Sequence, residues 1–302
     1  MQPLLYHLRT KSIFLVFLIA LLYICTLPLI AQPCNTSFKV QKKGSGRPMI
    51  LIPGLYCSGS VWDEAVTYFS TRFECHTITL PGFAGQPPLR SDSLLPAVAK
   101  QIACYIRENK LEKPVIVGHS LGGWLALELG VRYPDVAGDI VCVSSAPFLP
   151  ALTMGTGINA DSARKIGLQI KRGMEAQQVA DVKAAQHYML RSMIRDTNRI
   201  PQVTNMAVQS DPATQAQAMY ELFSCDLRPL LKNIRSRILV LGDWIAYRQY
   251  GATHENVYDN LKAQFEQAGN VTIAISDTSR HFIMFDEPQW FYEQTDRFLA
   301  HH

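Results

Sequence analysis

The stretch that decides the fold reads Val115-Ile116-Val117-Gly118-His119-Ser120-Leu121-Gly122-Gly123-Trp124. Its β-branched beginning predicts a short buried strand, and the apolar segment that continues to Val131 predicts a helix. Between the two, Gly118 and Gly122 flank Ser120 and leave room for neighbouring backbone to come close. A serine at the apex of such a turn has a strained backbone and an exposed hydroxyl.

This context favours a nucleophilic role for Ser120. The amide of Leu121, at the N-terminus of the predicted helix, would then bind a developing oxyanion. The alternative is a serine that only caps the helix. The strand and the helix on its two sides favour the nucleophile, because that mechanism requires them.

The chain as a whole has the composition of a globular protein. Its 302 residues are 48% apolar and 18% charged, which allows one large core or one core with a small accessory domain. The formal net charge is +4, too weak an excess to indicate a nucleic-acid partner.

The first 31 residues form a separate segment. Two basic residues precede an apolar run from Ile13 to Cys25, and the small residue Ala31 stands near the end. This order is typical of a secretory signal, so we expect export to the periplasm or the medium, with cleavage near Ala31. The alternative is an uncleaved membrane anchor over residues 13–31, because the apolar stretch approaches the ~20 residues that cross a bilayer.

The remaining cysteines are scattered along the chain: Cys34, Cys57, Cys75, Cys104, Cys142 and Cys225. None of them forms a C-x-x-C pair, so the spacing indicates neither a zinc site nor a thioredoxin-like motif. An oxidising compartment would permit disulfides, whose pairing the sequence does not specify. Cys75 and Cys142 fall in predicted buried strands, where a free thiol packs as a small apolar group.

Beyond the signal, predicted strands and helices alternate. Besides the strand at 115, we expect strands at 49–53, 75–80, 139–144, 237–241 and 271–275. This alternation is typical of an α/β fold with a mostly parallel central sheet flanked by helices.

The alternation breaks from about residue 147 to residue 225, where the sequence is polar and helical. We expect a helical cap inserted over the strand ends; ordinary crossover helices are the alternative, which the length of the segment disfavours. The predicted organisation is a signal or anchor at 1–31, a core at 32–146 and 226–302, and the cap at 147–225.

In this order, the turn at Ser120, an upstream Pro53-Gly54-Leu55 loop and a late histidine resemble the α/β-hydrolase superfamily over about residues 38–299. The best-matched segments also include Ser279 to Met284. Similar proteins commonly have histidine-glycine in place of Pro53-Gly54 and often glycine in place of Arg280. Neither difference removes a group that the mechanism needs. The oxyanion donor after Pro53-Gly54 is a backbone amide, and the base is the histidine that follows Arg280.

The resemblance implies a serine hydrolase that works through an acyl-serine intermediate. Ser120 would attack a carbonyl carbon, and His281 would take its proton and return it to the leaving group. Amides of Leu55 and Leu121 would hold the oxyanion. A surface-loop histidine is the alternative reading of His281, and His119 is interpreted as a packing residue.

The acid of the expected triad is not at its usual place. In the family it usually stands three residues past the glycine that ends the preceding strand, and Ile245 occupies that position here. Asp243 is the nearest acid in the same turn and is our candidate, although its carboxylate could instead cap the turn. Other candidates are Asp226, Glu255 and Asp277. Because loss of a triad acid slows turnover without abolishing it, a Ser-His dyad also stays open.

Taken together, these patterns predict an exported serine hydrolase acting on a small or medium, largely neutral and apolar ester or related acyl compound. A cap would set its selectivity. We expect neither a cofactor nor a metal, because the remaining histidines lack acid or cysteine partners at ligand spacing. Two alternatives are an acyltransferase with an alcohol acceptor and a hydrolase-fold binding protein with weak or no catalysis. We expect no nucleic-acid partner, and membrane contact only through an uncleaved N-terminal segment.

Overall fold

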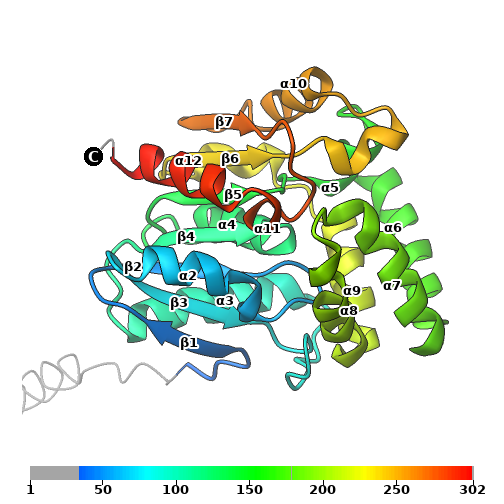
Figure 1. The fold of residues 1–302 in the computed structure, drawn as a ribbon, viewed down its shortest axis with the longest axis horizontal. Coiled ribbons are helices and arrows are strands. Elements are labelled where there is room, and N and C mark those ends of the chain that lie inside the picture. Colours follow the sequence, from blue (N-terminus) through cyan, green and yellow to red (C-terminus); the bar gives the residue numbers. More distant parts are fainter. Residues whose placement is uncertain (1–33, 178, 301–302) are drawn as a thin grey trace, which may run out of the picture. The chain divides into compact units, whose positions relative to one another are not determined.

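Seven strands form one sheet at the centre of the part of the chain that this computed structural model describes, residues 34–177 and 179–300 (Figure 1). The strands are β1 (Lys39–Lys43), β2 (Arg47–Ile52), β3 (Phe73–Thr79), β4 (Val115–His119), β5 (Ile140–Val143), β6 (Ile238–Gly242) and β7 (Val271–Ile275). Their spatial order is β1-β3-β2-β4-β5-β6-β7, with β1 antiparallel to β3 and every other pair parallel. The prediction of a mostly parallel sheet is confirmed.

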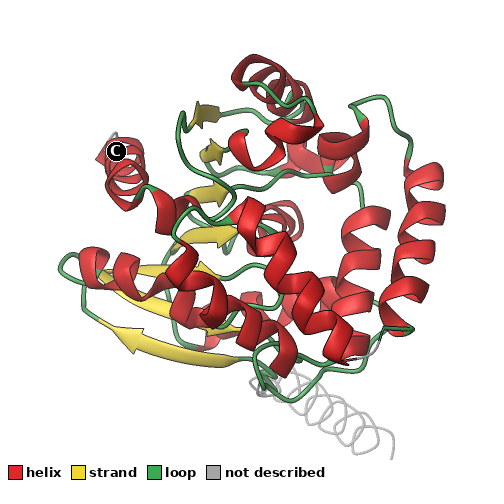
Figure 2. Ribbon diagram, turned by 45° about the vertical axis from the view of Figure 1, so that its right-hand side comes forward, coloured by secondary structure: helices red, strands yellow, loops and turns green. Residues whose placement is uncertain are grey.

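Helices cover both faces of this sheet (Figure 2). One face packs against α3 (Leu94–Glu108), α4 (Leu121–Arg132) and α10 (His254–Gln264), and the other against α2 (Asp63–Phe69) and α12 (Pro288–Ala300). Successive side chains of a strand point to opposite faces. In β4, Ile116 therefore joins one apolar cluster and Val117 the other.

The strand order places two loops together. After β2 the chain adds β3 on one side, and it then returns to add β4 on the other side of β2. In the parallel register of β2 and β4, Ile52 pairs with Gly118, so the residues that follow both strands emerge side by side. Such a reversal, at the carboxyl ends of parallel strands, is where α/β sheets bind ligands.

Between β5 and β6 the chain forms helices and no strand within the described residues, and this is the insertion that the sequence predicts. The helices are α5 (Leu149–Met154), α6 (Ala160–Glu175), α7 (Val179–Met193), α8 (Ile200–Gln209) and α9 (Pro212–Ser224), with short 3-10 helices η2 (Thr197–Arg199) and η3 (Arg228–Asn233). Figure 1 shows α6 to α9 gathered beyond the ends toward which the parallel strands point. The role of this insertion as a cap over the site stays a prediction.

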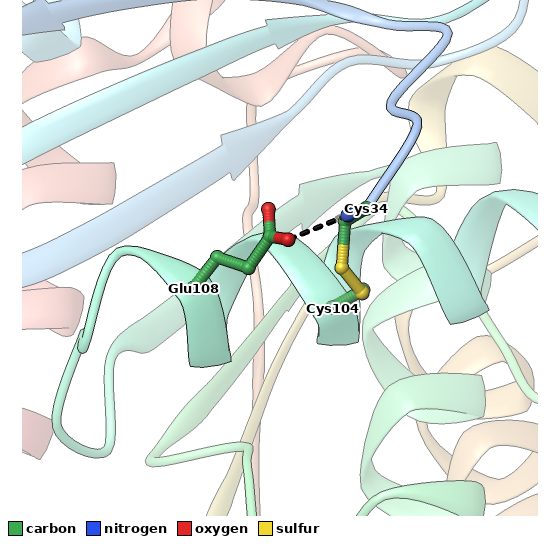
Figure 3. A group of neighbouring side chains, drawn as sticks. All are labelled: Cys34, Cys104 and Glu108. Atoms are coloured by element: carbon green, nitrogen blue, oxygen red, sulfur yellow. Dashed lines mark hydrogen bonds between the residues drawn. A yellow bond between two sulfur atoms is a disulfide. The ribbon is translucent and has the colours of Figure 1, made fainter. Parts of the chain in front are cut away.

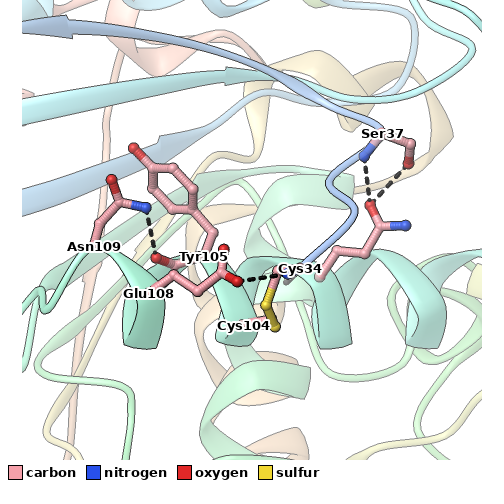
Figure 4. The surroundings of a disulfide bond; sticks show 7 residues. Cys34, Ser37, Cys104, Tyr105, Glu108 and Asn109 are labelled. Carbon is pink, nitrogen blue, oxygen red and sulfur yellow. Dashed lines mark hydrogen bonds between the residues drawn. A yellow bond between two sulfur atoms is a disulfide. The ribbon is translucent and has the colours of Figure 1, made fainter. Parts of the chain in front are cut away.

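A disulfide between Cys34 and Cys104 ties the arm that precedes β1 to α3 (Figure 3). Their Cα atoms are 5.9 Å apart, and the amide of Cys34 also donates to Oε1 of Glu108, at 2.5 Å. One turn away, the amide and the hydroxyl of Ser37 both donate to Oε1 of Gln101 (Figure 4). The arm therefore has a fixed path from its first described residue.

The other described cysteines are free thiols: Cys57, Cys75, Cys142 and Cys225. Burial of Cys75 and Cys142 in strands agrees with their predicted packing role. The segment that we interpret as a signal or anchor lies outside the described residues. Within those that are described, no helix combines the length and the apolar character needed to cross a membrane.

Candidate active site

Ser120 stands between the last residue of β4 and the first residue of α4. Its backbone has φ 53° and ψ −118°, a region that non-glycine residues adopt only under strain. β5 and the residues after it hold Ser120 there: the amide of Ser120 donates to the carbonyl of Val143 at 2.9 Å, and the hydroxyl of Ser145 donates to the carbonyl of Ser120 at 2.7 Å. The strained turn expected from the sequence is thus present.

Two glycines allow this turn to close against the sheet. A Cβ atom at Gly118 would lie 2.1 Å from the carbonyl oxygen of Gly122. A Cβ atom at Gly122 would lie 2.2 Å from the carbonyl oxygen of Ile52, in β2. Neither position has room for a side chain, so the close backbone approach anticipated from the sequence is real.

The two proposed oxyanion donors belong to segments that adjoin Ser120. Leu121 is the first residue of α4, where amides have no acceptor within the helix. Leu55 follows Gly54, and a Cβ atom at Gly54 would lie 3.2 Å from Cβ of Ser120. The loop after β2 therefore lies directly against the serine.

His281 lies on the loop between β7 and α11 (Ile283–Asp286), next to His119 at the end of β4. Nε2 of His119 donates to the carbonyl of His281 at 3.0 Å, and the two imidazole centroids are 4.8 Å apart. Burial of its side chain holds the pKa of His119 well below 6.5, and the nearby His281 lowers this pKa further. His119 is thus an uncharged, buried donor that fixes the His281 loop, in keeping with the packing role predicted for it.

Asp243 is the first residue after β6, and the structure brings it next to His281. Oδ1 of Asp243 is 3.9 Å from Nδ1 of His281. The same oxygen accepts a hydrogen bond of 2.5 Å from the hydroxyl of Ser144. Asp243 is 6% exposed, and its Oδ2 has no hydrogen-bond partner among the residues that the structure describes.

The other candidate acids are engaged elsewhere or open to solvent. The side chain of Asp277 is 84% exposed and lies 3.9 Å from His254. Glu255 is exposed in the first turn of α10. Asp226 forms an ion pair of 2.7 Å with Arg228. Of the acids considered, Asp243 is therefore the one that the geometry supports.

Arg280, where similar proteins often have glycine, joins the His281 loop to the inserted helices. Its Nη1 donates to the carbonyls of Arg191 and Ile194, at 2.5 and 3.1 Å. The amide of Phe282 donates to the carbonyl of Met193, at the end of α7. The insertion thus holds the backbone on both sides of His281.

A cavity of about 630 Å³ opens beside the pair of His281 and Asp243. It lies among α5, α10 and the 3-10 helix η4 (Ile245–Tyr250), and apolar side chains such as Leu149, Leu152 and Val257 line much of it. Among its described lining residues there is no lysine, arginine or glutamate, and Asp243 and His281 are the only aspartate and histidine. The cavity therefore suits an uncharged ligand.

Sequence reasoning missed two hydroxyl groups at this site, those of Ser144 and Tyr247. The tyrosine hydroxyl is 3.4 Å from Nδ1 of His281. Ser144 and Asp243 each come directly after one of two adjacent parallel strands, β5 and β6. Since the carboxyl ends of such strands meet at one edge, that position was the signal for Ser144. Tyr247 had no such signal, because η4 determines where its side chain points.

Potential metal ligands gather at one place in the described residues, where Cys34, Cys104 and Glu108 are close together (Figure 3). The two sulfur atoms are joined in the disulfide, so they are not available as thiolate ligands. This group lies on α3 and the arm before β1, not on the loops that carry Ser120 and His281.

Comparison with known proteins agrees with this architecture. A model of an alpha/beta hydrolase family matches residues 49–294. Among curated proteins, the pimeloyl-[acyl-carrier protein] methyl ester esterase of Vibrio vulnificus is 25% identical over 207 residues, which cover 68% of this chain and 79% of the relative. The esterase of the same name from Aeromonas salmonicida is 33% identical over 124 residues, 40% of this chain and 47% of the relative.

Solved structures show the same fold. MenH from S. aureus superimposes with a TM-score of 0.72 at 16% identity, covering 88% of this chain and 98% of its own. The enol-lactonase from Burkholderia xenovorans gives a TM-score of 0.70 at 14% identity, over 87% of this chain and 96% of its own. At such identities, the likeness concerns the fold.

Proposed function

The chain belongs to the alpha/beta hydrolase family and is a carboxylesterase-like hydrolase, and within that family we propose that it is an exported serine hydrolase for small neutral esters. The observation that carries this proposal is the strained Ser120 on a strand-to-helix turn, with His281 held by His119, the residue before Ser120, and Asp243 facing His281. Each of these groups comes from a different loop at the carboxyl edge of the sheet.

The proposed reaction has two halves. In the first, His281 takes the proton of Ser120 as the serine oxygen attacks the ester carbonyl, and the amides of Leu55 and Leu121 bind the oxyanion. His281 then gives that proton to the departing alcohol, which leaves an acyl-serine. In the second half, His281 takes a proton from water, the hydroxide attacks the acyl-serine, and the acid departs as the proton returns to Ser120. The carboxylate of Asp243 stabilises the imidazolium that forms at His281.

The cavity supports the choice of a neutral substrate. A volume of about 630 Å³ lies in the range of small-molecule sites. Its apolar walls would bury a hydrocarbon acyl group, and an ionised one would lose hydration there without a cationic partner among the lining residues. The curated relatives are methyl ester esterases by name, which supports ester cleavage as the reaction.

Export is supported by two independent features. The first is the order of basic residues, apolar run and small residue in the first 31 positions. The second is the disulfide between Cys34 and Cys104, since such bonds persist mainly in oxidising compartments. N-terminal sequencing of the mature protein tests this: a start close to residue 32 supports export with cleavage, and a retained Met1 favours the anchor.

The catalytic part is tested on a panel of neutral esters of increasing acyl length, with charged esters as comparison. We expect the native protein to hydrolyse neutral esters and Ser120→Ala to lose the activity. Ser93→Ala is a matched control, because that exposed serine makes no side-chain cap hydrogen bond and lies outside the site. Equal turnover by Ser120→Ala and the native protein would rule out the serine mechanism.

A further inference from the structure

His281 and Asp243 are not in direct hydrogen-bond contact. The 3.9 Å between Nδ1 and Oδ1 exceeds the range of a hydrogen bond. The hydroxyl of Tyr247 stands closer to the same nitrogen, at 3.4 Å. The phenol of Tyr247 is therefore better placed than Asp243 to orient the imidazole of His281.

Tyr247 reaches the histidine because the turn after β6 is a 3-10 helix. The residue at the usual acid position, Ile245, begins η4, and one short turn later Tyr247 meets His281 with its ring edge-on, the two ring planes 80° apart. Burial and the nearby Asp243 raise the pKa of Tyr247. Its phenol therefore stays protonated, and a neutral hydroxyl oxygen can accept a hydrogen bond from Nδ1–H.

Ser144 holds the carboxylate on the other side. Its backbone has a φ of 47°, so this residue, like Ser120, is strained at the end of a strand. Its hydroxyl donates at 2.5 Å to Oδ1, the same oxygen that faces Nδ1 of His281. The bond from Ser144 thus holds the carboxylate of Asp243 too far from Nδ1 of His281 for a direct hydrogen bond, unless the imidazole ring moves toward it.

We propose that Tyr247 is a positioning residue for His281: its hydroxyl accepts the Nδ1–H hydrogen bond, with Asp243, anchored by Ser144, supplying the negative charge behind it. In this arrangement Nε2 is left unprotonated and free to accept the proton of Ser120. The inference rests on the proposed serine mechanism. It adds that Tyr247 helps to orient His281, a role that the triad acid has in similar proteins and that Ile245, at the usual acid position, cannot perform.

The test is Tyr247→Phe, which removes the hydroxyl and keeps the ring. The matched control is Tyr188→Phe, which removes the hydroxyl of a tyrosine that is 80% exposed on α7. Rates are expressed per active serine, counted by titration with a phosphonylating probe, so that unfolded molecules do not lower the result. Thermal unfolding of all three proteins is followed in parallel.

We expect Tyr247→Phe to lower kcat about tenfold, the effect of losing one hydrogen bond to a group that becomes charged, with KM changed less than about twofold. The acid limb of the pH profile of kcat/KM should move to lower pH, because losing an acceptor destabilises the imidazolium of His281. The ionisable groups around His281 are Asp243, Tyr247 and His119. Burial and the nearby His281 hold the pKa of His119 well below 6.5.

Two results would overturn the inference, and they differ. If the native protein is labelled at Ser120 but Tyr247→Phe keeps its kcat and its pH profile, Tyr247 has no positioning role and the serine mechanism stands. If the native folded protein takes up no probe, the serine mechanism fails and the role of Tyr247 fails with it.

Discussion

Gly122→Ala tests whether the oxyanion site depends on the close packing of the turn at Ser120 against β2. The added Cβ atom would stand 2.2 Å from the carbonyl oxygen of Ile52 and 2.7 Å from that of Pro53. Both neighbours are backbone atoms, so they cannot turn aside as a side chain would. Either the start of α4 or the end of β2 has to move by about 1 Å to reach an ordinary contact distance.

Each of these movements displaces one oxyanion donor, Leu121 in the first case and Leu55 in the second. Losing one such donor typically lowers kcat by about 100- to 1,000-fold. The strain itself should lower the free energy of unfolding by about 1–3 kcal/mol. We therefore expect Gly122→Ala to fold with a moderately lower free energy of unfolding. Its kcat should fall much further than partial unfolding of the protein would explain.

The assay is steady-state hydrolysis of a neutral ester, together with chemical denaturation. Gly173→Ala is the matched control, because a Cβ atom there, in α6, meets nothing within 4 Å. It should keep the native kcat and be equally or slightly more stable. A Gly122→Ala protein with native kcat would refute the reasoning, since the oxyanion site would then not depend on the close approach.

Further predictions concern the acid, the disulfide and the buried histidine. Asp243→Asn should lower kcat by at least about tenfold, whereas Asp277→Asn should not change it, as measured with the same ester; equal losses would contradict the assignment of Asp243. Replacing Cys34 and Cys104 by serine should lower the free energy of unfolding by about 4 kcal/mol, because the disulfide closes a loop over a separation of 70 residues and so restricts the unfolded chain. Denaturant titration measures this, and an unchanged midpoint would show that the bond does not form. The depressed pKa of His119 means that the unfolded chain takes up a proton first, so stability is lost as the pH falls below 6.5. His119→Gln, which keeps a donor for the carbonyl of His281, should lose less stability over that interval, and an identical pH dependence would contradict the buried neutral state.

Local patterns predict much of this fold. The predicted strand at 271–275 coincides with β7, and Thr253 caps α10 through a reciprocal capping box with Asn256. These features depend on residues that are near one another in the sequence, so local chemistry is enough to recognise them. The helical character expected for residues 147–225 is likewise present, in helices that include α8.

The parts of the site that were harder to predict depend on contacts across the chain. The pair of Cys34 and Cys104 joins positions 70 residues apart, and no spacing rule selects it from the cysteines present. Asp243 could be chosen from its place in the right turn. Ser144 could have been chosen too, because it directly follows β5 as Asp243 follows the adjacent strand β6. The hydroxyl of Tyr247 could not, because only the path of η4 brings it to His281.

The central claim, that Ser120 is the nucleophile, is tested most directly by locating a covalent adduct. The purified protein is treated with a phosphonylating probe, digested, and mapped by mass spectrometry. We predict one adduct, on the hydroxyl of Ser120, and its loss in Ser120→Ala while the exposed Ser93 stays unmodified. A folded native protein that carries no adduct, or carries it on another serine, would contradict the account.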